Sequence, residues 1–237
     1  MSYIDGFVGA VPAANKDAYR QHVLEAVPLF KESGVARMVE TWGDDVGKGE
    51  VTDFFRAVEA TAEEVIVFSW MEYPDREARQ AANERMMSDE HMGAAVEQMP
   101  FDGERVIYGG FATILDKDSG AEPGYIDGSV IPVPTANKDA YTELAAMRAE
   151  VMMEHGATRV VNAWGDDVPD GKRTDFKRAV NATAEESVVF ARVEWPSKEI
   201  RDAAWPKIYG DARMHTEKGL FEGERMIFGG FAPLLDV

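Results

Sequence analysis

Cysteine is absent from the 237-residue chain. This absence excludes disulfide bonds, thiolate metal ligands and cysteine nucleophiles. The sequence also lacks a basic segment followed by an apolar run at its start, and no stretch reaches the roughly 20 apolar residues that a membrane helix needs. We therefore expect a soluble, cytoplasmic protein.

Basic residues are scarce relative to acidic ones. The chain has 25 Lys and Arg against 43 Asp and Glu, and its formal net charge is −18. A surface of this sign repels nucleic-acid phosphates and anionic membranes at long range. We expect neither as a partner, and solubility is the simplest reason for the acidity.

Several motifs of common enzyme classes are also missing. The sequence contains no GxSxG nucleophile elbow, no P-loop, no Rossmann glycine fingerprint in a strand–helix context and no zinc-ligand spacing. No reaction can therefore be read directly from a motif.

The chain contains an internal duplication. Tyr3–Tyr19 reads YIDGFVGAVPAANKDAY, and Tyr125–Tyr141, 122 residues later, reads YIDGSVIPVPTANKDAY. The same offset aligns two copies of WGDDV, TDF and ATAEE, and after a two-residue deletion FDGERVIYGGFA aligns with FEGERMIFGGFA. A period of this length is too long for a solenoid repeat, so it predicts two domains in tandem.

A short polar segment rich in Gly and Pro separates the copies. Such a composition is typical of a linker. We predict repeat 1 at residues 1–117, the linker at 118–124 and repeat 2 at 125–237.

Each copy shows the same order of predicted elements. In repeat 1 a helix with Asn15 as its N-cap ends at Gly34, and a second helix follows Pro74; in the second helix of repeat 2, Pro206 predicts a break or kink. The predicted strands of repeat 1 are Tyr3–Val11, Val35–Val46, Val65–Tyr73 and Arg105–Leu115. The order β-α-β-β-α-β predicts a ferredoxin-like α+β fold.

The strands are apolar on both faces. In Val65–Tyr73, Ile66, Phe68 and Trp70 alternate with Val67 and Met71. The two helices of a copy can cover only one face, and soluble monomers rarely expose the other. We therefore predict that the two copies pack sheet to sheet, since burying about 1,000 Å² of apolar surface stabilises the pair by roughly 25 kcal/mol before costs.

The openings YIDGFV and YIDGSV, the two WGDDV elements and the closing FDGERVIYGGFATILD and FEGERMIFGGFAPLLD resemble the YbaA-like family of uncharacterised bacterial proteins. The resemblance covers nearly all of each copy and implies a dimeric α/β barrel, here formed within one chain, because a usual family member has one copy. It implies no established activity. The wider superfamily includes cofactor-independent monooxygenases, haem enzymes and ligand-binding proteins.

Four charged residues are the candidates for catalysis. Glu72 and Glu194 share a strand face with large side chains, and burial there would raise the carboxyl pKa and suit a general base. Arg37 and Arg159 could hold an anionic ligand. The alternatives are a Glu that reaches water at a strand end and an Arg that pairs with a nearby acid.

Four aromatic residues are the candidates for ligand binding. Trp42 and Trp164, with Tyr3 and Tyr125, occur at equivalent positions and could line a pocket between sheet and helices. The alternative is ordinary core packing. Differences between the copies, such as Phe7 against Ser129, suggest that only one pocket is open.

We expect no metal and no cofactor. The pairs Asp44–Asp45 and Asp166–Asp167 could bind a hard cation, but neighbouring strand residues point to opposite faces, and turn-forming Asp is the alternative. The four histidines occupy no equivalent positions, which excludes a symmetric pair of histidine sites. His91 beside Met92 could indicate a haem site. The alternative is an ordinary surface histidine.

The sequence thus predicts an uncharacterised tandem α/β-barrel protein that binds a small apolar or aromatic metabolite. One alternative is a cofactor-independent monooxygenase-like enzyme, and another is a structural or interaction module without a ligand. The expected partner is the chain's own second repeat, and further homo-oligomerisation stays open, as does whether the protein is an enzyme.

Overall fold

A computed structural model describes residues 1–88, 99–216 and 219–237. Repeat 1 contains β1 (Tyr3–Pro12), α1 (Lys16–Ser33), β2 (Arg37–Asp45), α2 (Phe54–Ala57), β3 (Glu64–Tyr73), α3 (Arg76–Ser88) and β4 (Ile107–Asp118). Repeat 2 contains β5 (Tyr125–Pro134), α5 (Lys138–Glu154), β6 (Arg159–Asp167), α6 (Phe176–Ala179), β7 (Glu186–Trp195), α7 (Lys198–Gly210) and β8 (Ile227–Asp236). His91 and Met92 lie outside the described residues.

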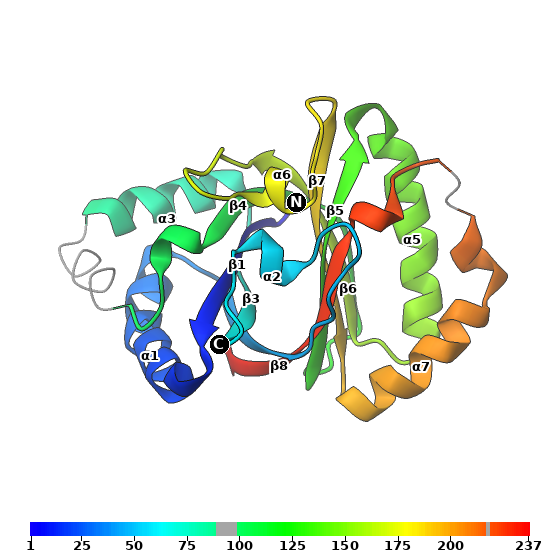
Figure 1. The fold of residues 1–237 in the computed structure, drawn as a ribbon. Coiled ribbons are helices and arrows are strands. Elements are labelled where there is room, and N and C mark those ends of the chain that lie inside the picture. Colours follow the sequence, from blue (N-terminus) through cyan, green and yellow to red (C-terminus); the bar gives the residue numbers. More distant parts are fainter. Residues whose placement is uncertain (89–98, 217–218) are drawn as a thin grey trace.

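The eight strands form one closed barrel with the order β1-β3-β2-β8-β5-β7-β6-β4. Each repeat contributes four adjacent antiparallel strands in the ferredoxin-like order, and the repeats join where β2 pairs with β8 and β4 with β6. In Figure 1, α1 and α3 lie on one side of the barrel and α5 and α7 on the opposite side. The predicted fold, an intrachain dimeric α/β barrel, is confirmed.

The alternation along the strands decides which side chains enter the barrel. Ile66, Phe68 and Trp70 belong to the barrel core, whereas Val67 and Met71 pack beneath the helices of repeat 1. The barrel core combines residues of both repeats, as the two-faced strands predict. At its centre the rings of Phe68 and Phe190 stack with centroids 4.4 Å apart.

Two short helices close one end of the barrel. In α2 the carboxylate of Asp53 caps the helix by accepting a hydrogen bond from the backbone N–H of Arg56 at 2.8 Å, and Phe54 enters the core. The repeats also bind each other here: Thr52 Oγ1 donates to the carbonyl of Ala179 and Thr174 Oγ1 to that of Ala57.

Two predictions about helix ends need correction. Asn15 precedes α1, but its amide donates to the carbonyl of Pro100 at 2.7 Å and makes no capping bond. Helix α7 continues through Pro206 to Gly210, so the predicted break at this proline is wrong. In the described parts of the chain, no helix is both long and apolar enough to cross a lipid bilayer.

The last strand of each repeat contains a pair of glycines, Gly109–Gly110 in β4 and Gly229–Gly230 in β8, where a tyrosine side chain lies close to the backbone. The β4–β6 register shifts between Gly110 and Phe111. A Cβ on Gly110 would lie 2.6 Å from the hydroxyl of Tyr3, and one on Gly230 would lie 2.5 Å from the hydroxyl of Tyr125. Glycine at these positions therefore accommodates both an irregular strand register and the nearby tyrosine.

We expect the substitution Phe68→Ala to lower the free energy of unfolding by about 3–5 kcal/mol, because it removes a buried ring from the contact between the two repeats. Urea unfolding of the full chain measures the change. Phe228→Ala, at a ring that is 59% exposed, is the control. Equal losses in the two variants would show that the stacked pair does not hold the barrel together.

Candidate functional site

The four predicted catalytic residues meet at the end of the barrel opposite α2 and α6. Arg37 begins β2 and Glu72 lies near the end of β3, and Arg159 and Glu194 are their equivalents in repeat 2. Each guanidinium makes two hydrogen bonds of 3.0 Å to the glutamate of the other repeat. We call these four residues the barrel-end cluster.

A fifth residue, Arg192, completes this cluster and breaks its symmetry. Its side chain is buried, its Nε donates to Glu194 at 3.0 Å and its Nη2 donates to Glu72. The guanidinium lies 4.4 Å from the ring centroid of Trp70, the residue at the equivalent position in repeat 1. The difference between these two positions was the only sign of this arrangement in the sequence.

The expected rise in the Glu72 pKa is wrong. Burial does oppose ionisation, but the positive charges of Arg192, Arg159 and Arg37 outweigh it and lower the pKa of Glu72 to about 2. Glu72 is therefore a carboxylate at neutral pH, held in ion pairs.

The guanidinium donors at the cluster's edge are also engaged by acids. Arg37 pairs with Asp236 through Nε at 2.9 Å and Nη2 at 2.7 Å, and Arg159 pairs with Asp116 at the same two distances. A hollow of about 460 Å³ lies over this end, lined by Arg37, Arg159 and residues of the linker. The catalytic role of the four residues stays a prediction.

The predicted ligand-binding aromatics are spread over the outside of the sheets. The ring of Trp42 packs 6.3 Å from that of Tyr19, with the ammonium of Lys16 above it, and Trp164 has the same setting. The hydroxyl groups of Tyr3 and Tyr125 donate hydrogen bonds to an aspartate of the WGDDV element in the opposite repeat. None of these four predicted residues lines a pocket beneath the helices, and their ligand role stays a prediction.

The aspartate pairs of the two WGDDV elements join the repeats. Tyr3 Oη donates to Asp166 at 2.9 Å, and Arg79 pairs with Asp167 at 2.6 Å. Repeat 2 mirrors these bonds with Tyr125 to Asp44 and Arg201 to Asp45. Within residues 1–88, 99–216 and 219–237, no group of three or more potential metal ligands comes together.

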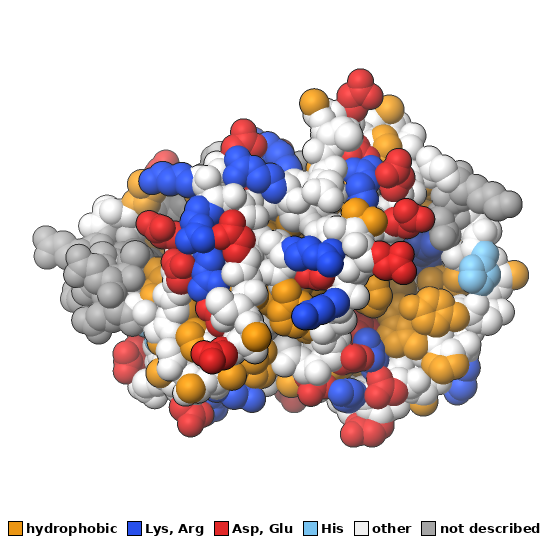
Figure 2. Space-filling view, viewed as in Figure 1, with side chains coloured by type: hydrophobic (Ala, Val, Ile, Leu, Met, Phe, Trp, Pro, Cys, Tyr) orange, Lys and Arg blue, Asp and Glu red, His pale blue; other side chains and the backbone are white. Residues whose placement is uncertain are grey.

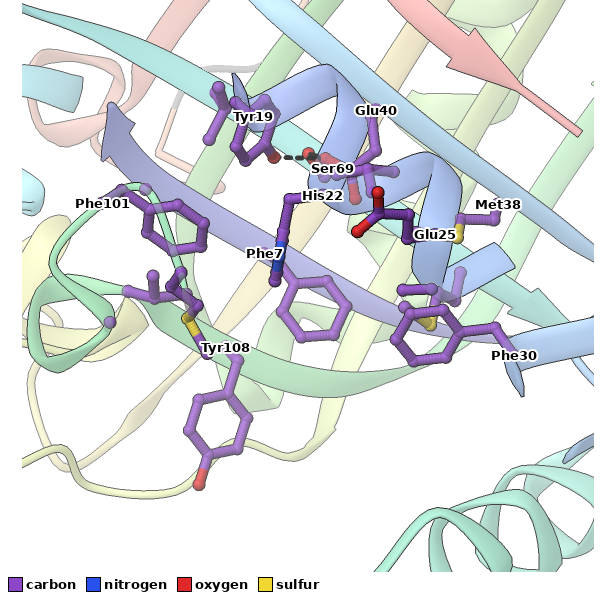
Figure 3. A pocket seen from close by; sticks show the side chains of 18 of the residues that line it. Phe7, Tyr19, His22, Glu25, Phe30, Met38, Glu40, Ser69, Phe101 and Tyr108 are labelled. Atoms are coloured by element: carbon purple, nitrogen blue, oxygen red, sulfur yellow. Dashed lines mark hydrogen bonds between the residues drawn. The ribbon is translucent and has the colours of Figure 1, made fainter. Parts of the chain in front are cut away.

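Each repeat has a pocket of about 530 Å³ between its sheet and its long helix. Figure 3 shows the pocket of repeat 1, and Figure 2 shows hydrophobic side chains gathered on the α5 and α7 side of the molecule. The expectation that only one repeat keeps an open pocket is wrong. The rings that line the first pocket are those of Phe7, Tyr19, His22, Phe30, Phe101 and Tyr108.

The floor of the repeat 1 pocket carries a buried carboxyl group. Glu40 is 8% exposed, and one of its oxygens, Oε2, accepts hydrogen bonds from Tyr19 Oη at 2.5 Å and from Ser69 Oγ. Burial raises the pKa of Glu40 although both hydrogen bonds lower it. Burial also lowers the pKa of His22, so this wall of the pocket carries a neutral imidazole near pH 7.

The pocket of repeat 2 has a different floor. Asn162 stands where repeat 1 has Glu40, and its Oδ1 accepts a hydrogen bond from Tyr141 Oη at 2.9 Å. Ala191 replaces Ser69, and Arg148 lines the wall where repeat 1 has Ala26. The two pockets thus share a size and a tyrosine but differ in charge.

Glu40 is not among the residues predicted from the sequence, although the sequence carries a signal for it. Glu40 shares a face of β2 with Met38 and Trp42, which belong to the apolar layer beneath the helices. A single carboxylate in an apolar row indicates a buried acid. The contact of Glu40 with Tyr19 has no such signal, since sequence alone does not place a helix over a particular strand position.

Two four-stranded sheets, closed into one barrel and flanked by helices outside, define a dimeric α/β barrel built within a single chain. The chain belongs to the family described as "Protein of unknown function (DUF1428)", whose model matches residues 2–103 and 124–229. YbaA of Escherichia coli K12 is 58% identical over 117 residues, which are 49% of this chain and all of that protein, and YbaA of Shigella flexneri matches equally. This chain is therefore a tandem duplication of the YbaA-like unit.

Solved structures resemble the whole barrel. A proposed monooxygenase from Fusobacterium nucleatum is 11% identical with a TM-score of 0.62, covering 99% of this chain and 93% of that one. A second, from Lactobacillus acidophilus, is 10% identical with a TM-score of 0.59, covering 100% and 96%. At these identities the likeness concerns the fold alone.

We expect Glu72→Gln to destabilise the protein by about 3–5 kcal/mol at pH 7, because it leaves the buried Arg192 without its full set of partners. The stabilisation by Glu72 is present above the unfolded-state pKa of about 4.3 and is lost as the pH falls towards 2. The difference between wild type and variant in urea unfolding should therefore shrink over this range. The exposed Glu32→Gln is the control; a difference that is constant with pH would contradict the assignment.

Proposed function

We propose that this protein binds small, largely apolar molecules, with an aromatic ring as the best fit, in the pockets beneath α1 and α5. The observation that carries the proposal is the pair of pockets of about 530 Å³, one in each repeat. Ligand pockets in proteins span about 300–1,000 Å³ and combine apolar walls with a few polar groups. Both features occur here.

The size of these spaces argues against the structural-module alternative. Protein interiors are close-packed, and voids much larger than a water molecule are few. The barrel core follows this rule, with stacked rings at its centre. The outer layer of each repeat departs from it at the same place, beneath the long helix, which supports a binding role for the space.

A cofactor-independent monooxygenase-like enzyme is the second candidate, and the likeness in fold to two proposed monooxygenases favours it. Glu72, Glu194, Arg37 and Arg159 line neither pocket beneath the helices. A reaction in those pockets would therefore use other residues. Oxygen uptake on addition of a bound molecule would support this candidate over simple binding.

We expect incubation of the full chain with a metabolite mixture, followed by native mass spectrometry, to reveal up to two bound molecules. Ala26→Phe fills the repeat 1 pocket from α1, and Ala145→Phe fills the repeat 2 pocket from α5. Each variant should lose one bound molecule and the double variant both. Ala18→Phe, at an exposed position of α1, is the control. Unchanged binding in the folded double variant would overturn the proposal.

A further inference from the structure

We propose that the two pockets have different ligand preferences, and that the repeat 1 pocket selects ring compounds that carry a hydroxyl group. This inference rests on the proposed binding function and names the ligand class of one pocket. It comes from the floor residues Glu40 and Asn162, which occupy equivalent positions in the two repeats.

The carboxyl group of Glu40 has one oxygen left for a ligand. Its Oε2 takes the hydrogen bonds of Tyr19 and Ser69, and no described residue donates a hydrogen bond to Oε1. Glu40 is more than nine-tenths buried and lines the pocket. Because Oε1 has no donor from the described residues, it is a ready acceptor for a donor that enters the pocket.

The walls favour a ring over a flexible chain. Phe7, Phe30 and Phe101 lie around the space above Glu40 (Figure 3). Aromatic faces and edges of this kind pack well against another ring. A planar ring whose hydroxyl points at the floor would satisfy Oε1 and contact these side chains together.

A neutral hydroxyl suits this floor better than a charged group. Burial disfavours the ionised form of Glu40, which weakens the attraction of a cation. An anionic ligand would be repelled by the ionised form and would find Glu25 on the same wall. A phenolic hydroxyl has no net charge, donates to Oε1 when Glu40 is ionised and accepts from it when Glu40 is protonated, so it meets neither difficulty.

The repeat 2 floor presents the opposite polarity. Because Asn162 Oδ1 accepts the hydrogen bond of Tyr141, its amide nitrogen is left to donate towards the pocket. This amide therefore offers a donor where the repeat 1 pocket offers an acceptor, and it suits a ligand with a carbonyl or carboxylate head.

Three probes of similar shape test the inference on the full chain: 2-naphthol, 2-methylnaphthalene and 2-naphthoate. Titration calorimetry measures the affinity and the number of sites for each probe. In wild type we expect one site that binds 2-naphthol at least about tenfold more tightly than 2-methylnaphthalene, the effect of one buried hydrogen bond. Glu40→Asn with Ser69→Ala gives repeat 1 the floor of repeat 2 and should abolish that preference. The reciprocal pair, Asn162→Glu with Ala191→Ser, should raise the number of such sites from one to two.

The outcomes separate the inference from the proposed function. If the probes bind and Ala26→Phe removes a site, but the floor substitutions leave the naphthol preference unchanged, the inference fails and the binding function stands. Preference for 2-naphthoate in repeat 1 also overturns it. If none of the three probes binds wild type, the inference fails, and the metabolite-mixture experiment decides the binding function separately. Glu40→Gln, close to isosteric, provides the same comparison if the double variant does not fold.

Discussion

Each four-stranded sheet of this protein is apolar on both faces, and that constraint organises the rest of the structure. The helices cover the outer face, and the inner face needs a second sheet. The other repeat supplies it, so the stacked rings of Phe68 and Phe190 come from different halves of the chain. Short helices close one end of the barrel and ion pairs fill the other, because the closed sheet leaves only its ends to be covered.

The interior of the barrel is filled by side chains, and the pockets lie instead on the outer face of the sheets. The core side chains at the barrel centre are fully buried and contact one another across the repeats. Beneath α1 and α5, by contrast, the side chains between helix and strand leave space unfilled. Both pockets lie in this layer, with a tyrosine of the helix reaching the strand below at Glu40 and Asn162.

The sequence alone predicted which side chains of a strand face the core, because that depends on their alternation along the strand. It did not predict contacts that form only where two separate elements meet. The side chains of Val65–Tyr73 divide between core and outer layer as their period of two requires. Glu72 shows the limit: its burial was foreseeable, but the sign of its pKa shift depends on Arg192, which lies 120 residues away. The Tyr19–Glu40 contact was likewise invisible, because it depends on where α1 crosses the sheet.

Fusion of the repeats permits an asymmetry that a pair of identical chains lacks. In a symmetric pair, equivalent residues near the axis face copies of themselves. Here Trp70 faces Arg192, and the guanidinium stacks on the indole while its charge binds Glu72 and Glu194. Two buried arginines at these positions would repel each other, and two tryptophans would leave the glutamates with fewer donors. The same freedom allows a carboxyl in one pocket and an amide in the other, so duplication gives this chain two chemically distinct pockets on one scaffold.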